Sequence, residues 1–583
     1  MSKIKVTDYI ASFISKHTKH VFVGQGGSVV HLLDSIDKQK GLEIIPSQNE
    51  QAASIAADAY ARVKGNTGFC IATSGPGILN LFQGIACSYY DSVPTMSFSG
   101  AVTMDAMRDR KIIRQAGFQQ MDVVKMTKPF TKYSVLVKDC KQIRYELEKS
   151  LYLANEGRPG PVVVDLPDDI QRAYINPKLL KSFKPKKIKK KYFNVKKFNN
   201  YLLKAKRPLV IAGNGINISK TKKDLIHFLK KTKIPFAPTW STVDIFYEKD
   251  LQEQNVGIFG VAASRHGNFA IQNADLLICL GTRLNTQLTG SRPETFGKNA
   301  KKILVDIDYA EFKKTNKIKI DFKINLNLKD FFYVLNKTTT KKISYSSKWL
   351  EKIIIWKKKY SILDENNSIK KNFINPYYFI NTLSKLTKKE NIIIPDASAN
   401  LIWTYQGYEF KKKQTMFTAL NHSPMGYSVA ASIGAQLANK NSNIIAIIGD
   451  GSMQMNIQEL QTIKNFNLPV KIFIMNNEGY GLIKQTQETW LKGNHVGVDA
   501  KSGLGLPDFK KVSISYGLKS LKLTNQKSLH KNLKKILMLK EAVVCEIIVD
   551  PLYRVKPKID SGKEIDDMSP LINRKEFLSN KVK

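Results

Sequence analysis

The chain has 583 residues, 43% of them hydrophobic, which is long enough for several domains that each bury a core. No run of 18 or more apolar residues occurs and the first residues lack the apolar core of a signal peptide, so we expect no membrane span and a cytoplasmic protein. A formal net charge of +43 is typical of polyanion-binding proteins, but lysines occur in almost every segment, and their densest run, 178–197, lacks the aromatic–glycine pattern of RNA-binding modules, so we interpret it as a solvated linker.

Short apolar segments alternate with helical patterns from residue 1 to about 175, which is typical of a parallel α/β layer. We expect a strand, a glycine turn and a helix in 20–36, and a strand and an Ala-rich helix in 43–65. A strand, a Gly-Pro-Gly turn, a helix and a further strand are expected in 68–100. Parallel strands end at one edge of their sheet, so the residues that follow them should lie together there.

Glu50 stands in the first turn of the Ala-rich helix, within the sequence NEQAASIAADAYAR. A structural interpretation is that its carboxylate complements the helix dipole. A catalytic interpretation is that a carboxylate at a shielded helix start, with its proton affinity tuned by burial, takes part in acid–base chemistry. Taken alone, the residue favours the structural interpretation.

A second α/β unit is predicted after the lysine-rich linker. Its expected strands are the apolar segments 207–216, 233–240, 274–284 and 300–308. The polar connector that follows, 334–372, carries two tryptophans at helical spacing, and we interpret it as an amphipathic linker helix.

The third unit begins near Phe373, and its most informative stretch is Ile444–Gln485. A buried strand there ends at a Gly-Asp-Gly turn around Asp450, a helix follows, and a second strand runs directly into Asn476–Asn477. In a parallel sheet both strands end at the same edge, so Asp450 and Asn477 should emerge side by side. A carboxylate and an amide oxygen beside a helix N-terminus suit Mg²⁺ that holds a diphosphate, and the flanking glycines would let the backbone approach the phosphate.

A Gly-Asp-Gly triplet alone is an ordinary tight turn, but the whole stretch resembles the thiamine-diphosphate motif, GDG followed about two dozen residues later by NN. The words around it resemble the acetolactate synthase branch of that family. The resemblance runs from about residue 4 to 575 and implies three doubly wound parallel-sheet domains. They are a pyrimidine-binding domain at 1–175, a central domain at 190–335 and a diphosphate-binding domain at 373–560, followed by a tail at 561–583 that would fold over the active site.

The resemblance also assigns roles to residues. Asp450, Asn477 and the carbonyl of Gly479 would hold the metal ion. Glu50, whose surroundings are similar to the family's HEQ word, would bond to the aminopyrimidine ring of the cofactor and promote loss of the thiazolium proton.

Further catalytic positions implied by the resemblance are Gly27, whose backbone N–H would steady an oxyanion, Phe118, which would form one side of the pocket, and Gln119, which would reach the substrate–cofactor adduct. The glycine turn around Gly27 and the turn at 74–77 are equally compatible with a purely architectural role. The implied cofactor contacts are Ser74, Pro76, Gly77, Asn80, Asn400, Ser423, Met425, Gly449, Gly451, Ser452 and Leu482.

Acetolactate synthases bind FAD in the central domain as a structural group, whereas many relatives keep this domain empty. The matching positions are mostly glycines of the fold, so the resemblance leaves FAD open. These positions are Arg158, Gly213, His266, Gly281, Arg283 and Asp306.

The implied function is thiamine-diphosphate- and Mg²⁺-dependent decarboxylation of a 2-oxo acid, with pyruvate as the leading donor, and transfer of the acyl unit to a second carbonyl compound. Asp168, Gln287 and Thr486 differ from the Lys, Arg and Trp that the family often has in its access channel. These differences favour an acceptor other than pyruvate, such as a keto-sugar. The alternatives are a non-oxidative 2-oxo acid decarboxylase and, from charge alone, a polyanion-binding protein.

The family also implies a homodimer or homotetramer with active sites between chains, in which Glu50 of one chain faces Asp450 of another. We expect small-molecule substrates and neither a nucleic-acid nor a membrane partner. Nothing in the sequence indicates whether a regulatory subunit exists.

Overall fold

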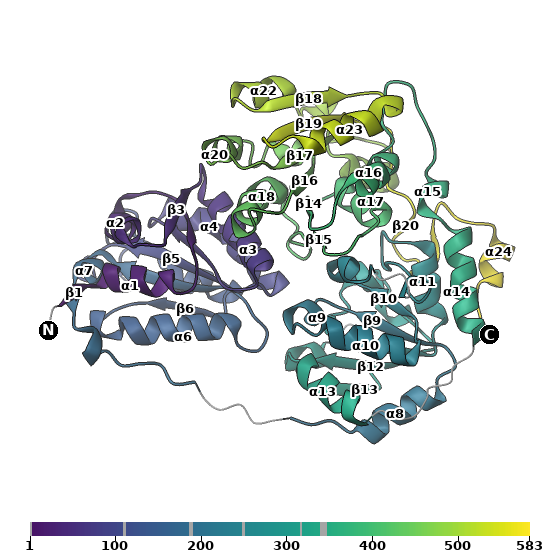
Figure 1. The fold of residues 1–583 in the computed structure, drawn as a ribbon, viewed down its shortest axis with the longest axis horizontal. Helices are drawn as coiled ribbons and strands as arrows, with labels where there is room; N and C mark the ends of the chain where they lie inside the picture. Colours follow the sequence, from purple (N-terminus) through teal and green to yellow (C-terminus); the bar gives the residue numbers. More distant parts are fainter. Residues whose placement is uncertain are drawn as a thin grey trace.

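A computed structural model describes residues 3–108, 112–185, 191–247, 251–314, 317–338 and 347–582. Three parallel sheets flanked by helices follow one another along the chain (Figure 1). The predicted α/β class with three doubly wound units is therefore confirmed. None of the described helices combines the length and the apolar character that crossing a bilayer requires.

The first unit is built on a six-stranded sheet in which all neighbouring strands are parallel. Its strands in spatial order are β3 (Glu43–Pro46), β2 (His20–Val23), β4 (Gly68–Ala72), β5 (Thr95–Ala101), β7 (Val162–Pro167) and β6 (Tyr133–Leu136). Its main helices are α1 (Val6–Ser15), α2 (Val30–Lys38), α3 (Glu50–Lys64), α4 (Pro76–Asp91) and α6 (Ile143–Asn155).

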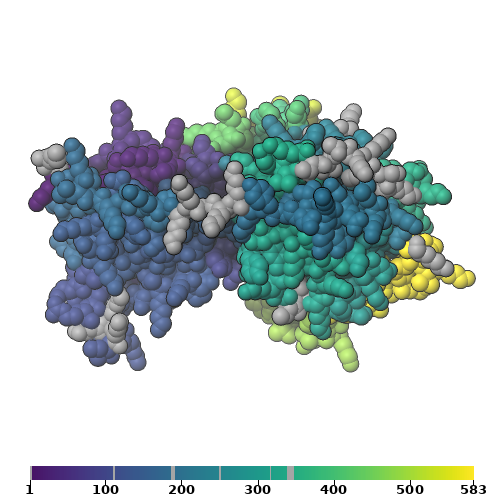
Figure 2. Space-filling model, turned by 90° about the horizontal axis from the view of Figure 1, so that it is seen from below, coloured from purple at the N-terminus to yellow at the C-terminus, as the bar shows by residue number. Residues whose placement is uncertain are grey.

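The central unit has a five-stranded parallel sheet, ordered β10 (Phe236–Pro238), β9 (Pro208–Ala212), β11 (Leu276–Leu280), β12 (Lys301–Asp306) and β13 (Phe322–Asn325). Helices α8 (Val195–Lys204), α10 (Lys222–Thr232), α11 (Arg265–Asn273) and α13 (Leu328–Thr338) accompany it. Figure 2 shows this unit beside the first one.

The third unit returns to a six-stranded parallel sheet, because its Ile- and Val-rich strands are buried on both faces. The order is β15 (Thr415–Met416), β14 (Ile392–Pro395), β16 (Ile444–Gly449), β17 (Lys471–Asn476), β19 (Val543–Ile548) and β18 (Lys519–Leu523). Its helices include α16 (Pro376–Leu386), α17 (Ala399–Gly407), α18 (Tyr427–Ala438), α19 (Asp450–Met453), α20 (Glu459–Asn465), α21 (Gly481–Trp490) and α23 (Leu529–Met538).

The first and third sheets share one topology. Strands β2 to β7 take the same places in the first sheet that β14 to β19 take in the third. Helices α3 and α18 follow the equivalent strands β3 and β15, and the two helices pack against each other between the sheets (Figure 1). The closeness of this contact depends on small residues, since a Cβ at Gly434 would lie 1.9 Å from the carbonyl oxygen of Ala56.

A buried polar network joins the first unit to the third. The guanidinium of Arg62 lies 2.7 Å from Asp58 and 3.0 Å from Asp91, and it donates to the carbonyl oxygen of Thr418 at 3.2 Å. The hydroxyl of Tyr427 on α18, in the third unit, donates to the carboxylate of Asp58, in the first unit, at 2.6 Å. Two carboxylates thus share one guanidinium that is 13% exposed.

The connector and the tail pack on the central unit. Helix α14 (Ser347–Lys359) buries both of its tryptophans, and the indole N–H of Trp356 donates to Asn580 in the tail at 2.8 Å. Arg265 of α11 donates to the carbonyl oxygens of Met568 and Pro570 in the tail. Aromatic packing and these backbone bonds fix the tail on α11 and α14.

We expect Arg62→Ala to lower the free energy of unfolding by about 3–5 kcal/mol, because it leaves two buried carboxylates without their cation. The matched control is Arg144→Ala, which breaks a half-exposed pair with Glu148 and should cost less than about 1 kcal/mol. Urea unfolding of the two variants makes the comparison. Equal costs would show that the interdomain network is energetically neutral.

Candidate active site

The carboxyl ends of β2 and β4, where the strand order of the first sheet reverses, form a first half-site around Glu50. The Glu50 side chain lies over Gly24, where a Cβ would come within 2.0 Å of its Cγ. Asn80 donates to a carboxylate oxygen of Glu50 at 3.0 Å, and a Cβ at Gly77 would approach the other oxygen to 3.3 Å. The glycines leave room for the carboxylate and Asn80 orients it.

The two predicted glycine turns of this half-site are bonded to each other. Ser28, next to Gly27, shares a hydrogen bond between hydroxyls with Thr73 at 2.9 Å. The backbone N–H of Ser74 donates to the Ser28 hydroxyl at 2.8 Å. Thr73 is not among the predicted site residues, although it lies next to Ser74, which is.

Gln119 joins the first half-site, but Phe118 does not close it. Gln119 has a positive φ of 59° and lies over the turn that contains Gly75. A Cβ added to Gly75 would lie 2.8 Å from the Cβ of Gln119. Phe118 is 84% exposed, so it forms no side of a pocket within one chain.

A carboxylate of the third unit holds the residues that precede Glu50. Glu459, at the start of α20, accepts the backbone N–H of Asn49 at 3.0 Å and that of Gln48 at 3.3 Å. Its side chain is fully buried, and this burial raises its pKa. Asn49 in turn caps α3 by accepting the N–H of Gln51 at 2.8 Å. No pattern in the sequence indicates Glu459, because the backbone N–H groups that it accepts lie some 400 residues away in the chain.

The second half-site lies at the ends of β16 and β17 and is centred on Asp450. One carboxylate oxygen of Asp450 accepts the backbone N–H groups of Asn477 and Gly479, each at 3.0 Å. The other accepts the N–H of Gly451 at 2.6 Å. Burial raises the pKa of Asp450 to about 6, against the lowering effect of these bonds and of the Lys484 ammonium. Asp450 and Asn477 therefore lie side by side, as parallel strands require.

Two glycines of the second half-site have neighbouring protein atoms in the space that a side chain would occupy. A Cβ at Gly451 would lie 2.2 Å from the Tyr480 ring, and one at Gly479, where φ is 126°, would lie 2.1 Å from the carbonyl oxygen of Val498. The Tyr480 ring is thus a reason for glycine at position 451 in addition to the close approach of backbone to phosphate that the sequence predicts.

Asp396, which follows β14 and has no exposed surface, organises the same edge of the sheet. Its two oxygens accept the backbone N–H groups of Gly426 at 3.0 Å and Ser428 at 2.8 Å, at the start of α18, and burial raises its pKa. The amide of Asn400 is used inside this turn, since it accepts the N–H of Asp396 and donates to the Ala397 carbonyl. Asp396 went unpredicted, although it follows a buried strand just as Asp450 does.

The remaining predicted residues lie close to these elements. Ser452 bonds to Asp396, and Met425, half-buried, directly precedes Gly426. Ser423 is exposed with a positive φ of 52°, and Leu482 on α21 is half-buried.

Models of thiamine pyrophosphate enzymes match the chain in three places. The N-terminal thiamine-pyrophosphate-binding domain matches 4–126, the central domain 195–332 and the C-terminal binding domain 396–547. The chain belongs to the thiamine pyrophosphate enzyme family.

Within this family the chain is similar to proteins named acetolactate synthase large subunit. That of Cyanidium caldarium is 31% identical over 98% of this chain and 97% of its own length. That of Buchnera aphidicola subsp. Schizaphis graminum is 33% identical over 96% of this chain and 97% of its own length. That of Lactococcus lactis subsp. lactis is 31% identical over 94% of this chain and 93% of its own length. The protein is accordingly a thiamine-diphosphate-dependent enzyme that resembles acetolactate synthase.

The donor set around Asp450 fits a hard cation that holds the cofactor's diphosphate. The described residues include no group of three or more His, Cys, Asp or Glu able to hold a metal ion by themselves. A cation here would therefore rely on one buried carboxylate, the amide oxygen of Asn477, a backbone carbonyl and phosphate oxygens. This combination of oxygen ligands is the one that Mg²⁺ favours.

A cavity of about 1210 Å³ lies where the three units meet. Four of the six positions matched to FAD line it: Arg158, Gly281, Arg283 and Asp306. The other two are used by the fold. The Nδ1–H of His266 donates to the Tyr360 carbonyl at 3.2 Å and burial lowers the pKa of His266 to about 4, while Gly213 packs against Gly281.

The three residues predicted for one access channel lie apart within a single chain. Gln287 lines the central cavity. Asp168 pairs with Arg172 at 2.7 Å and lies 3.7 Å from His31, whereas the Thr486 hydroxyl donates to the Leu482 carbonyl. Any common channel would need more than one chain.

Proposed function

We propose that this enzyme uses thiamine diphosphate and Mg²⁺ to decarboxylate a 2-oxo acid, with pyruvate as the leading donor, and transfers the acyl unit to a second carbonyl compound. The observation that carries the proposal is the pair of half-sites on equivalent edges of two sheets that share one topology. Similarity to acetolactate synthase large subunits over 98% of the chain supports the same chemistry.

Bound thiamine diphosphate supplies a nucleophilic carbon and an electron sink for the departing carboxyl group. We assign to Glu50, oriented by Asn80, the bond to the cofactor's aminopyrimidine ring and control of its proton. Asp450, the Asn477 amide and the Gly479 carbonyl would hold Mg²⁺. Gly27 is an exposed residue in a turn that the Ser28–Thr73 hydrogen bond holds, and we assign to its N–H the oxyanion-binding role.

The two half-sites are proposed to meet between chains of a homodimer or homotetramer. Phe118, next to Gln119 of the first half-site, is 84% exposed, and Trp490, at the end of the α21 helix that follows the second half-site, is 70% exposed. Burial of these apolar side chains against a second chain would favour association. A second chain that covers Phe118 would give this residue the pocket-forming role predicted from the sequence.

A keto-sugar or another weakly anionic acceptor is the second candidate, and Gln287 favours it. This residue lines the central cavity, and its amide lacks the guanidinium fork that binds a carboxylate.

The same cavity is the place we assign to FAD. Its volume is sufficient for a dinucleotide, but the Arg158 guanidinium already lies 2.9 Å from Asp308 and 3.1 Å from Glu311.

The direct test is product analysis with pyruvate, thiamine diphosphate and Mg²⁺, with and without a keto-sugar. We expect carbon dioxide and a carboligation product from the wild type, and a rate at least ~100-fold lower from Glu50→Ala, because proton control is lost while the metal half-site is intact. Acetolactate as the main product would identify pyruvate as the acceptor, and a sugar adduct would identify the keto-sugar. Free aldehyde alone would favour the decarboxylase instead.

Gly24→Ala tests the placement of Glu50 without changing the carboxylate. The new Cβ would overlap Glu50 Cγ and displace the side chain, so we expect pyruvate turnover to fall by about 100-fold. Gly505→Ala is the matched control, since a Cβ there meets nothing within 4 Å. Wild-type turnover in Gly24→Ala, with correct folding, would contradict the assignment of Glu50.

A further inference from the structure

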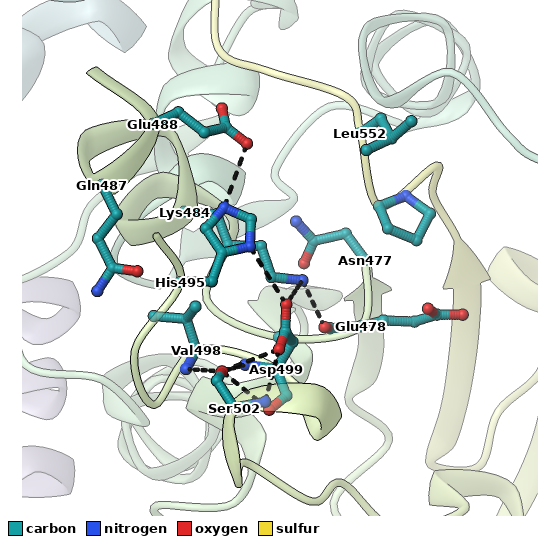
Figure 3. Close-up of polar contacts among 12 residues, drawn as sticks. Asn477, Glu478, Lys484, Gln487, Glu488, His495, Val498, Asp499, Ser502 and Leu552 are labelled. Carbon is teal, nitrogen blue, oxygen red and sulfur yellow. Dashed lines mark hydrogen bonds and ion pairs between the residues drawn. The ribbon is translucent and has the colours of Figure 1, made fainter. Parts of the chain in front are cut away.

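Lys484 on α21 is a buried cation beside the loop that carries the assigned metal ligands. Its side chain is only 4% exposed. Its ammonium donates to the carbonyl oxygen of Glu478 at 2.8 Å and lies 3.5 Å from a carboxylate oxygen of Asp499 (Figure 3). Burying a lysine is costly unless its charge is paired and hydrogen-bonded, so this position has a specific requirement for one.

The peptide between Glu478 and Gly479 is held from both sides. Its C=O accepts from Lys484, and its N–H donates to Asp450 at 3.0 Å. The C=O and N–H of a planar trans peptide point in opposite directions, so the two bonds together fix the orientation of its plane. This orientation matters because the next carbonyl along the chain, that of Gly479, is an assigned metal ligand.

The backbone of this loop is strained and needs such support. Glu478 has a φ of 57°, a left-handed conformation that costs a residue with a side chain about 1 kcal/mol or more. Its N–H donates to the side chain of Asn476 at 3.0 Å. Without the bond from Lys484, only the bond from the Gly479 N–H to Asp450 would hold this peptide against the strain.

Asp499 ties Lys484 to the segment that covers the other side of the loop. The Asp499 carboxylate accepts from the backbone N–H of Ser502 at 3.1 Å and from its hydroxyl at 2.8 Å (Figure 3). The neighbouring carbonyl of Val498 accepts the N–H of Tyr480 at 2.9 Å. The metal loop is therefore enclosed between α21 and 498–502.

Further charged side chains lie next to the Lys484–Asp499 pair. His495 lies 3.6 Å from Asp499 and 3.5 Å from Glu488, which pairs with Arg554. Lys484 and Asp499 are the members of this group that reach the loop itself.

We propose that Lys484 is a positioning residue that sets the affinity of the Asp450–Asn477–Gly479 site for Mg²⁺, with Asp499 as its counter-ion. It acts through the Glu478 carbonyl and does not touch the metal or the substrate. The proposal rests on the metal site assigned above.

The test measures metal binding directly, with Mn²⁺ as a paramagnetic substitute for Mg²⁺ and thiamine diphosphate at saturation, by electron paramagnetic resonance of the free ion. We expect Lys484→Met to weaken Mn²⁺ binding at least 10-fold and Asp499→Asn to weaken it to a smaller extent. At saturating metal, turnover of pyruvate by Lys484→Met should recover to within about threefold of the wild type, because the chemical groups are untouched.

Lys471→Met is the matched control. Lys471 is 2% exposed and its ammonium donates to two carbonyl oxygens, of Pro469 and Glu541, but at the opposite end of β17. We expect this variant to lose stability and to bind Mn²⁺ within twofold of the wild type. Equal affinity in Lys484→Met and Lys471→Met would overturn the proposal.

Two further variants keep the outcomes separate. If Asp450→Ala binds Mn²⁺ as the wild type does, the assigned metal site is wrong and the proposal falls with it. If Asp450→Ala loses binding while Lys484→Met does not, only the role of Lys484 is wrong. Should Lys484→Met fail to fold, Asp499→Asn decides, since unchanged affinity in that variant would also contradict the proposal.

Discussion

Helices α3 and α18 approach each other so closely that a Cβ at Gly434 would overlap the Ala56 carbonyl, and both parts of the site depend on this contact. Helix α3 begins with Glu50. Helix α18 begins where Asp396 accepts two backbone N–H groups, at the edge of the sheet that also carries Asp450. Because the first and third sheets share one topology, the contact places two equivalent sheet edges on one chain in a fixed relation.

Buried charges at these edges share one arrangement. Asp396, Glu459 and Asp450 each accept two or more backbone N–H groups from a segment that is distant in sequence or follows a sharp turn. Lys484 donates to a carbonyl in the same way. Each charge offsets its desolvation by ordering backbone, so its loss is expected to displace a loop as well as cost stability. Such fixed loops suit a site that must hold a diphosphate and a metal in one geometry.

The three α/β units, and the adjacency of Asp450 and Asn477, followed from the sequence, because both depend on local patterns and on the rule that parallel strands end at one edge. Glu459 and Lys484 could not be found in this way, since the backbone groups that they hold could be supplied by any residue. The contacts of the tail with α11 and α14 could not be predicted, because the bond between Trp356 and Asn580 leaves no periodic signal. The roles of Gly24 and Gly451 emerged only from the side chains that lie over them.

The central claim is that a complete site combines the first half-site of one chain with the second half-site of another. The most direct test mixes Glu50→Ala and Asp450→Ala chains, each inactive alone, under conditions of subunit exchange verified by native mass spectrometry. In a mixed dimer one site carries both changes and the other carries none, so random exchange should restore about a quarter of wild-type activity. Exchange without any recovery of activity would show that each site is built within a single chain and would contradict the account.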